Sequence, residues 1–446
     1  MRAIAVAAQP PGTQSLWRDK RFVAFWTSYT VSQLGDRVTE LALPLIAVVV
    51  LDATPSQVGV LIAAVWLPNL IAMFVGTWID RRTHKRRVLI VADLFRAAAL
   101  LAVPIAYSLD ALTLGVLYAV ALATGMGEVM FHMAYPGFYV RLVRPESYVD
   151  ANSKLSASRA ASFVGGPAVA GALIHAVTAP VAIIIDAISF VFSAAVIGRL
   201  RGSEAAATTV AQSGPEAQSL VRQALDGLRF VARHSVLRAS LGCTTTINFF
   251  TFIAQALLIL YASRTLGLSD AVIGLALGVG AAGGIVGAVL APRIARVIGI
   301  GRTIMVGAVL FPAPIAIAAA ANGTPLTNAI VLSAAELLSS IGVMLFDINQ
   351  NAVSTSVTPD DMRGRTAGAF STINYGSRPV GAIVGGLLGT AIGLRPTLLV
   401  AAIGGTLGVC WLLRSPIAHM ATVAAVPADA ESLTEAEPLP AAEGRG

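Results

Sequence analysis

The sequence is poor in charged residues. Only 12% of its 446 residues are Asp, Glu, Lys or Arg, whereas a soluble globular domain carries about 25%. Hydrophobic residues make up 56%, and the mean hydropathy is +0.76. A chain of this length and composition cannot hide its apolar surface in one water-soluble core. A soluble globular protein is therefore excluded.

Cysteine and histidine are also scarce. The two cysteines, Cys243 and Cys410, lie inside apolar runs, and no Cys-x-x-Cys or Cys/His cluster indicates a metal site or a disulfide framework. The histidines are scattered, at positions 84, 132, 175, 234 and 419, and none has the His-Glu-x-x-His spacing of a zinc enzyme. We therefore expect no enzyme, no metal and no cofactor.

Long apolar runs are what the sequence has instead. About twelve segments are long enough to cross a bilayer, which takes about 20 residues. Only helices and closed barrels satisfy their backbone in lipid, and these runs lack the two-residue alternation of a membrane barrel. The sequence therefore predicts an all-α membrane protein with twelve transmembrane helices. The segments span residues 22–50, 56–79, 88–108, 111–135, 155–177, 180–199, 237–262, 270–292, 301–321, 325–348, 366–391 and 396–414.

The lysines and arginines lie mainly in alternate links between these segments. The links on the other side hold only Arg264 and Arg395. Because basic links stay in the cytoplasm, we expect a cytoplasmic-membrane protein with both termini in the cytoplasm. The same placement explains the net charge of +7 without a nucleic-acid partner. The basic links contain Arg81, Arg82, Lys85, Arg86 and Arg87; Arg141, Arg144 and Lys154; the region from Arg199 to Arg238; Arg293, Arg296 and Arg302; and Arg363 and Arg365.

The longest link divides the chain into two halves of about six helices each. The predicted parts are a cytoplasmic tail (1–21), an N-terminal bundle (22–200), a linker (201–236), a C-terminal bundle (237–414) and a disordered tail (415–446). From Leu220 onward the linker has apolar residues at positions 221, 225, 228 and 231 with arginines between them. This pattern predicts either an amphipathic helix at the membrane interface or a plain soluble linker helix.

The two halves resemble each other in sequence. Val143-Arg144-Pro145-Glu146 follows the fourth segment, and Val357-Thr358-Pro359-Asp360 follows the tenth. Internal repeats of this size are typical of secondary transporters, whose substrate site lies between the repeats near the middle of the membrane. An enzyme scaffold has no obvious need for such a repeat.

The link between the second and third segments carries a motif. It reads Gly76-Thr77-Trp78-Ile79-Asp80-Arg81 and continues to Lys85-Arg86-Arg87. This stretch resembles the loop motif of the major facilitator superfamily. Thr83 and His84 stand where that motif usually has glycine and arginine, so the match is incomplete.

The loop motif predicts a conformational latch. A close glycine contact between helices and an acid among basic groups would hold one state and break when the protein changes state. We expect Gly76, Asp80 and Arg81 to form this latch, and Asp93 and Arg96, near the cytoplasmic interface, to brace it. Positive-inside charge alone would explain the arginines but not the glycine and the acid.

The fifth segment carries a second motif, Gly166-Pro167-Ala168-Val169-Ala170-Gly171. It resembles the antiporter motif of the same superfamily, with Ala170 in place of the first of the paired glycines. Gly166, Pro167 and Gly171 would give a kinked helix that a neighbour approaches closely, and the resemblance favours export. Glycine and proline are frequent in membrane helices in any case, so a purely structural role stays open.

Three further stretches are more specific. They are Asp186-Ala187-Ile188-Ser189-Phe190, Gly227-Leu228-Arg229-Phe230 and Phe346-Asp347-Ile348-Asn349-Gln350. Together they resemble the branch of the superfamily that contains enterobactin exporters and macrolide-efflux proteins. The resemblance covers about residues 16–416. It implies two pseudo-symmetric six-helix bundles and proton-coupled export, but no particular substrate.

Several ionisable residues lie within the predicted membrane segments, where charge is costly and marks function. Asp36 and Glu40 are four residues apart on the first segment and share a helix face. Three other segments carry polar stripes, and the resemblance implies that these four helices line a central cavity. The stripes are Thr124, Glu128 and His132; Asn248, Thr251 and Gln255; and Ser333, Glu336 and Ser340.

These residues give two sets of candidates. We expect the coupling proton on one or more of Asp36, Glu40, Glu128 and Glu336. The substrate-cavity candidates are Arg37, Thr124, Asn248, Thr251, Gln255, Ser333 and Ser340. Glu40 ranks ahead of Asp36 because the adjacent Arg37 can hold Asp36 ionised, although Arg37 can equally form a structural pair with either acid. Arg159 and Arg378 are expected to pair with acids.

These observations predict a monomeric secondary active transporter that exports a small amphiphilic compound, such as a drug or an antibiotic, by proton antiport and alternating access. Its partners would be the substrate, protons and the lipid bilayer, and the proton gradient would drive it without a cofactor. The acids favour a cationic drug, whereas additional cavity arginines would favour an anionic siderophore. A siderophore or metabolite exporter, and a non-transporting membrane sensor or scaffold, stay open as alternatives.

Overall fold

The computed structural model describes residues 16–80, 82, 84–144, 147–200, 220–359 and 362–422. Within these residues every regular element is a helix. The prediction of an all-α membrane protein is confirmed. The predictions for the first part of the linker, for most of both tails, for Arg81 and for the side chain of Asp80 lie outside the described residues.

The first half supplies six membrane segments. A short helix, η1 (Leu16–Arg18), precedes them, and Asp19 caps the first segment by accepting hydrogen bonds from the backbone of Arg21 and Phe22. The second segment bends at Pro68, because proline cannot continue the helical hydrogen-bond ladder. The six segments are α1 (Lys20–Leu45) with η2 (Ile46–Val50); α2 (Pro55–Trp66) with η3 (Leu67–Ile71) and α3 (Ala72–Asp80); α4 (Lys85–Ser108); α5 (Leu114–Leu142); α6 (Tyr148–Val177); and α7 (Ala179–Arg199).

The second half repeats the arrangement after the predicted linker helix, α8 (Leu220–Arg233). This helix packs against α14 and α9, where Gly227 lies against the backbone of Arg365. The six segments are α9 (Ser235–Leu260) with η6 (Tyr261–Thr265); α10 (Asp270–Ile298); α11 (Ile300–Leu310) with α12 (Pro314–Ala320); α13 (Pro325–Ser356); α14 (Arg363–Ile392); and α15 (Leu394–Thr406) with η7 (Leu407–Val409) and α16 (Cys410–Leu413), followed by η8 (Pro416–His419).

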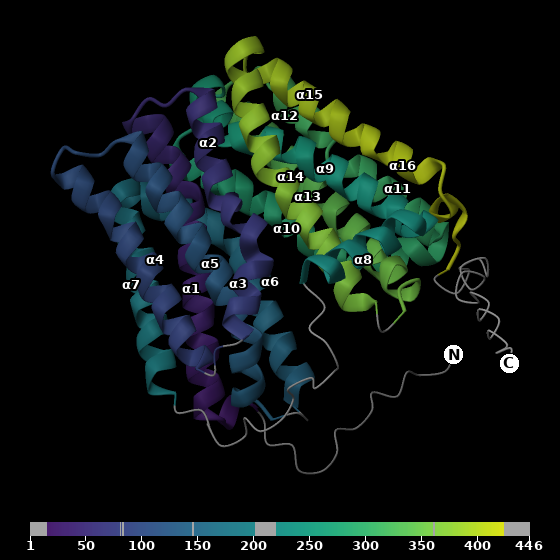
Figure 1. Cartoon of the computed structure of the whole chain (residues 1–446). Coiled ribbons are helices and arrows are strands. Elements are labelled where there is room, and N and C mark those ends of the chain that lie inside the picture. The colour runs from purple at the N-terminus through teal and green to yellow at the C-terminus, as the bar shows by residue number, and fades with distance from the viewer. Residues whose placement is uncertain are drawn as a thin grey trace, which may run out of the picture.

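Nine of the described helices are long and apolar enough to cross a membrane. The other three membrane segments do not meet this criterion of length and apolarity. The segments α1 and α14 carry several charged residues, and the segment of α2, η3 and α3 is broken at Pro68. Figure 1 shows the segments in two bundles, the first half at the left and the second at the right.

The hydrophobic core is shared at one end of the molecule and divided at the other. We call the end that carries the links α3–α4, α5–α6, α10–α11 and α13–α14 the basic end, and the other the opposite end. Towards the opposite end, one continuous core contains Leu45 and Ile183 from the first half together with Leu257 and Leu332 from the second. Towards the basic end each bundle has a core of its own. The bundles are therefore joined at the opposite end.

The two main helix pairs of this join are α6 with α10 and α2 with α14. A Cβ atom on Gly274 of α10 would lie 2.6 Å from the Cα of Gly171 and 2.5 Å from the carbonyl oxygen of Pro167. A Cβ atom on Gly59 of α2 would lie 2.5 Å from the carbonyl oxygen of Ala382. The helices thus touch backbone to backbone, which small residues permit in membrane helices.

Candidate functional site

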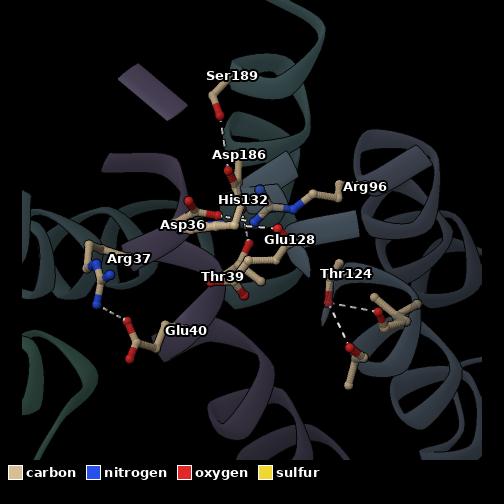
Figure 2. Close-up of polar contacts among 12 residues, drawn as sticks. Asp36, Arg37, Thr39, Glu40, Arg96, Thr124, Glu128, His132, Asp186 and Ser189 are labelled. Atoms are coloured by element: carbon tan, nitrogen blue, oxygen red, sulfur yellow. Dashed lines mark hydrogen bonds and ion pairs between the residues drawn. The ribbon is translucent and has the colours of Figure 1, made fainter. Parts of the chain in front are cut away.

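A buried arginine holds the N-terminal bundle together. Arg96 of α4 forms an ion pair with Asp36 of α1 (Figure 2). Its guanidinium lies 3.9 Å from the ring centroid of Phe190 on α7. Gly127 on α5 makes room for it, because a Cβ there would lie 2.4 Å from the Cγ of Arg96. One side chain therefore connects four helices.

This position corrects the predicted role of Arg96 as a brace for the loop latch. Arg96 is the twelfth residue of α4, which places it about 16 Å along the helix from its first residue. Its partner is a charge inside the bundle, because a buried guanidinium needs an acid at its own depth. Asp93, one turn earlier, is also fully buried and lies beside Ser193 of α7.

Asp186 of α7 is a second buried acid in this cluster. It accepts hydrogen bonds from the hydroxyls of Thr39 on α1 and of Ser189 on its own helix, the latter at 3.0 Å. Gly35 allows this approach, because a Cβ there would lie 2.3 Å from an Asp186 carboxyl oxygen. In the sequence, Asp186 stands out only as part of a motif. Its isolation in the apolar run 180–199 was the available signal.

Arg37 pairs with Glu40, one turn away on α1. Of the two pairings left open for Arg37, the structure shows the one with Glu40, and Asp36 pairs with Arg96 instead. The stem of Arg37 crosses α6 at Gly166, where a Cβ would lie 2.3 Å from the Cγ of Arg37. The glycine of the antiporter motif thus accommodates an arginine, while Pro167 and Gly171 face α10.

The polar stripe of α5 divides between the protein interior and the surface. Glu128 and His132 are exposed, and the Nδ1 atom of His132 lies 3.1 Å from the carbonyl oxygen of Glu128. Glu128 also lies within electrostatic range of Glu40 and Arg96 (Figure 2). Thr124 is buried and donates its hydroxyl to the carbonyl oxygens of its own helix. The hydroxyl of Thr124 is thus bonded within α5, and its cavity role stays a prediction.

The predicted stripes of the C-terminal bundle are partly bonded to their own helices. Asn248 donates to the carbonyl oxygen of Thr244 at 2.9 Å, and Ser333 to that of Ala329 at 2.7 Å. The hydroxyl of Thr251 is buried without a hydrogen-bond partner. Gln255 is exposed, and Ser340 is half-buried. These residues are placed on α9 and α13, and no pair of them is in hydrogen-bond contact within the described residues.

Glu336 is an isolated acid of the second half. It is half-buried on α13, and its Cβ faces α10, where a Cβ on Gly280 would lie 2.3 Å away. Among the described residues it makes no ion pair. Asp36 and Glu40 are paired with arginines, so Glu336 differs from both in having no cation beside it.

A group that the sequence analysis did not identify joins the bundles near Arg378, and we call it the Arg378 cluster. The guanidinium of Arg378 on α14 lies 4.3 Å from the ring centroid of Trp66 on α2, 4.6 Å from that of Tyr375 and 5.0 Å from that of Phe252 on α9. Its Nε is buried without a partner. Neither Arg378 nor Arg159 forms the ion pair predicted for it within the described residues. Aromatic faces attract the cation instead.

Basic residues in the described part of the loop motif bind carbonyl oxygens at the ends of helices. Lys85 donates to the carbonyl oxygen of Ile79 at 2.8 Å, and Arg86 donates to that of Ile197 at 2.9 Å. Basic side chains commonly bind the free carbonyls at helix C-termini in this way. Gly76 faces α5, where a Cβ would lie 3.2 Å from the sulfur of Met133. The contact predicted for Gly76 is present, while the partner of Asp80 lies outside the described residues.

The fold and its buried charges define a polytopic membrane protein built from two six-helix bundles. The family model of the Major Facilitator Superfamily matches residues 25–382 and 241–440. The chain belongs to this superfamily.

Relatives and solved structures agree with this assignment. The chain is 29% identical over 396 residues to "Multidrug efflux pump Tap" of Mycobacterium tuberculosis and Mycobacterium bovis, covering 83% of this chain and 87% of that protein. The nucleoside transporter NupG shares the fold with a TM-score of 0.70, at 12% identity over 88% of this chain and 99% of that one.

A bacterial homologue of the iron transporter ferroportin is also similar. In its inward-facing state it has a TM-score of 0.69, at 20% identity over 90% of this chain and 99% of that one. In its outward-facing state the TM-score is 0.54. At these identities the likeness concerns the fold alone.

Proposed function

We propose that this chain is a secondary active transporter that exports a small amphiphilic compound by proton antiport and alternating access. The observation that carries the proposal is the asymmetric join between the bundles. They share one core towards the opposite end and have separate cores towards the basic end. Charged residues of both bundles lie within electrostatic range of one another, as Glu128 and Arg378 do. Two bodies joined at one end around buried charges suit alternating access.

The basic end would face the cytoplasm, since basic links stay on that side. The protein would lie in the cytoplasmic membrane as a monomer, with the proton gradient in place of a cofactor. Cysteine labelling from outside intact cells tests the orientation. A cysteine near Pro180 should react, whereas cysteines at Arg82 and Arg229 should react only after permeabilisation. Labelling of either basic segment from outside would contradict the orientation.

Glu336 is the first candidate for the coupling proton. A carboxyl beside a cation holds its charge, whereas a carboxyl removed from water without a cation accepts a proton readily. Asp36 and Glu40 each have an arginine partner, and Glu336 has none among the described residues. Glu40 ranks second, because it is exposed and its pair with Arg37 links neighbours on a single helix. Glu128, which faces both bundles, ranks third.

The substrate class rests on two observations that point in different directions. The name of the relative Tap supports a drug as the exported compound. The Arg378 cluster supports a second candidate, an anionic or oxygen-rich aromatic compound such as a siderophore. Its guanidinium lies within electrostatic range of Asp347 and Glu128 but forms no ion pair among the described residues. Its donors can therefore bind an oxygen acceptor while the rings stack on an apolar part.

Efflux measured in a host that lacks its own pumps tests the proposal. Cells would be loaded with a panel of cationic, neutral and anionic fluorescent compounds, with and without a proton uncoupler. We expect at least one compound to accumulate less in expressing cells, and the uncoupler to abolish the difference. Uncoupler-insensitive efflux would contradict proton antiport, and no efflux of any compound would contradict a broad drug substrate.

The variant Glu336→Gln tests the coupling residue. It removes the titratable group and keeps its size and hydrogen bonding. We expect uphill efflux to fall to the level measured with the uncoupler, while expression and substrate binding stay unchanged. The matched control is Asp110→Asn, an acid-to-amide change at an exposed link. If Glu336→Gln and the corresponding amide variants of Asp36, Glu40 and Glu128 all pump normally, carboxylate coupling is wrong. In the same panel, Arg378→Gln should lower efflux of anionic compounds selectively.

A further inference from the structure

A cavity lies at the basic end of the C-terminal bundle, between the start of α9 and the turn formed by α16. Its volume is about 370 Å³. Residues of both elements line it, and they include Ser235, Arg238, Cys410, Trp411, Arg414 and Ser415. None of the residues proposed above for the substrate or the proton takes part in it. The cavity therefore calls for an explanation of its own.

The polar side of this cavity is cationic. Arg238 and Arg414 are both exposed, and neither forms an ion pair among the described residues. Arg238 donates one weak hydrogen bond, to the carbonyl oxygen of Ala232 at 3.4 Å. No acidic residue is among those that line the cavity. Burial lowers the pKa of the neighbouring His234, so His234 is neutral at pH 7 and the positive charge comes from the two arginines.

The other side of the cavity is an apolar wall built around Trp411. The indole of Trp411 lies flat on α9 at Gly242, where a Cβ would come within 2.5 Å of the ring. Its Nε1 donates to the hydroxyl of Thr246 at 3.2 Å. Half of the Trp411 surface stays exposed, as do Leu407 and Leu413 on the same segment. Tryptophan is enriched at the membrane–water interface, so this wall faces the lipid at the level of the headgroups.

We propose that this cavity binds the headgroup of an anionic phospholipid. The phosphate would lie between Arg238 and Arg414, because guanidinium groups bind phosphate oxygens through paired N–H donors. The acyl chains would run along Trp411 and the exposed leucines. Basic pockets between membrane helices at the cytoplasmic side recognise such headgroups. The proposal concerns lipid binding and does not depend on what the protein transports.

Cys410 provides a built-in reporter, because it is exposed and lines the cavity while Cys243 is buried. The full chain would be placed in nanodiscs of phosphatidylcholine alone or with phosphatidylglycerol, and the rate of N-ethylmaleimide labelling measured. We expect phosphatidylglycerol to slow labelling of Cys410 about fivefold for each arginine engaged. Native mass spectrometry should show phosphatidylglycerol retained on the protein.

Variants separate this site from a general effect of membrane charge. Arg238→Ala and Arg414→Ala should each lose most of the lipid-dependent protection, and the Arg→Lys variants should keep part of it. Arg302→Ala, a matched loss of one exposed arginine at the same end, should keep all of it. Equal effects of the three alanine variants, or no protection in the unmodified chain, would overturn the proposal.

Two other occupants give distinct results. If inorganic phosphate protects Cys410 in phosphatidylcholine discs as well as the lipid does, the site binds free phosphate and the lipid assignment is wrong. The tail 423–446 carries five acidic residues, Asp429, Glu431, Glu435, Glu437 and Glu443. A chain that ends at residue 422 tests whether the tail is the occupant. If Cys410 of that chain labels faster in phosphatidylcholine discs, and if phosphatidylglycerol does not slow this labelling, the tail is the occupant and the proposal fails.

Discussion

The two bundles share one architecture but treat their interior charges differently. In the N-terminal bundle two of the buried acids are bonded within the bundle, Asp36 to Arg96 and Asp186 to Thr39. In the C-terminal bundle Glu336 makes no ion pair among the described residues. A charge satisfied inside its own bundle acts on the packing of that bundle, whereas a charge without a protein partner is available for a proton or a ligand.

Close backbone contact is prominent in the C-terminal bundle. Along the pairing of α10 with α13, a Cβ on Gly283 would lie 2.3 Å from the carbonyl oxygen of Leu337, and one on Gly287 would lie 2.9 Å from the Cα of Ile341. Small residues and polar bonds are the two main ways of joining helices in lipid. The bonded acids Asp36 and Asp186 contribute to the packing of the first bundle, whereas Glu336 is the residue that we propose for coupling.

Removing Arg96 should break this comparison most strongly. In Arg96→Met the side-chain volume is largely kept, but Asp36 loses its partner inside the bundle. Losing one member of a buried ion pair costs about 3–5 kcal/mol. We expect a correspondingly large fall in the thermal unfolding temperature in detergent, and a low yield of folded protein in the membrane.

The double variant Asp36→Asn with Arg96→Met serves as the control, because it removes both charges. If the pair is structural, the double variant should recover much of the lost stability, and the two single variants should be strongly non-additive. If Arg96→Met unfolds at the temperature of the unmodified protein, the N-terminal network does not hold the bundle. Glu336→Gln should leave the unfolding temperature unchanged.

Gly274→Ala should have an intermediate effect, on the join between the bundles rather than on either bundle. The added methyl would lie 2.5 Å from the carbonyl oxygen of Pro167. Overpacking of this kind costs about 1–3 kcal/mol. Here it destabilises the state in which the two bundles are in contact at the opposite end. We expect a Ser56→Cys reporter at the opposite end, in a Cys410→Ser background, to label roughly fivefold to 150-fold faster.

The control for this variant is Gly284→Ala on the same helix. A Cβ there would have its nearest neighbour at 4.0 Å, an ordinary contact. It should leave labelling of the Ser56→Cys reporter unchanged. Equal labelling in the two glycine variants would show that the close contact between α6 and α10 does not govern the join.

The sequence predicted the helices better than it predicted the partners of their charges. Helices follow from apolar runs of about 20 residues, and Gly166 and Gly171 could be recognised as contact residues. The pairing of Arg96 with Asp36 joins positions 60 residues apart, and the Arg378 cluster depends on how α2 meets α9 and α14. Such contacts are set by the packing of the bundles, which one sequence does not specify. Closeness along the chain left Arg37 between Asp36 and Glu40, and only the packing decides for Glu40.

Asp52→Asn should have the smallest effect, because it removes an ion pair that joins the bundles at the surface. Arg264 of η6 pairs with Asp52, whose side chain is 93% exposed. Exposed pairs contribute about 0.2–1 kcal/mol, so the Ser56→Cys reporter should label less than about fivefold faster. The effect should fade in 1 M salt, where the screening length is about 3 Å.

Asparagine is the right replacement because residue 52 has a φ of 49°, which asparagine tolerates. Asp110→Asn, also exposed and with a φ of 52°, is the matched control and should change nothing. A larger effect for Asp52→Asn than for Gly274→Ala would mean that charge, rather than backbone contact, holds the bundles together.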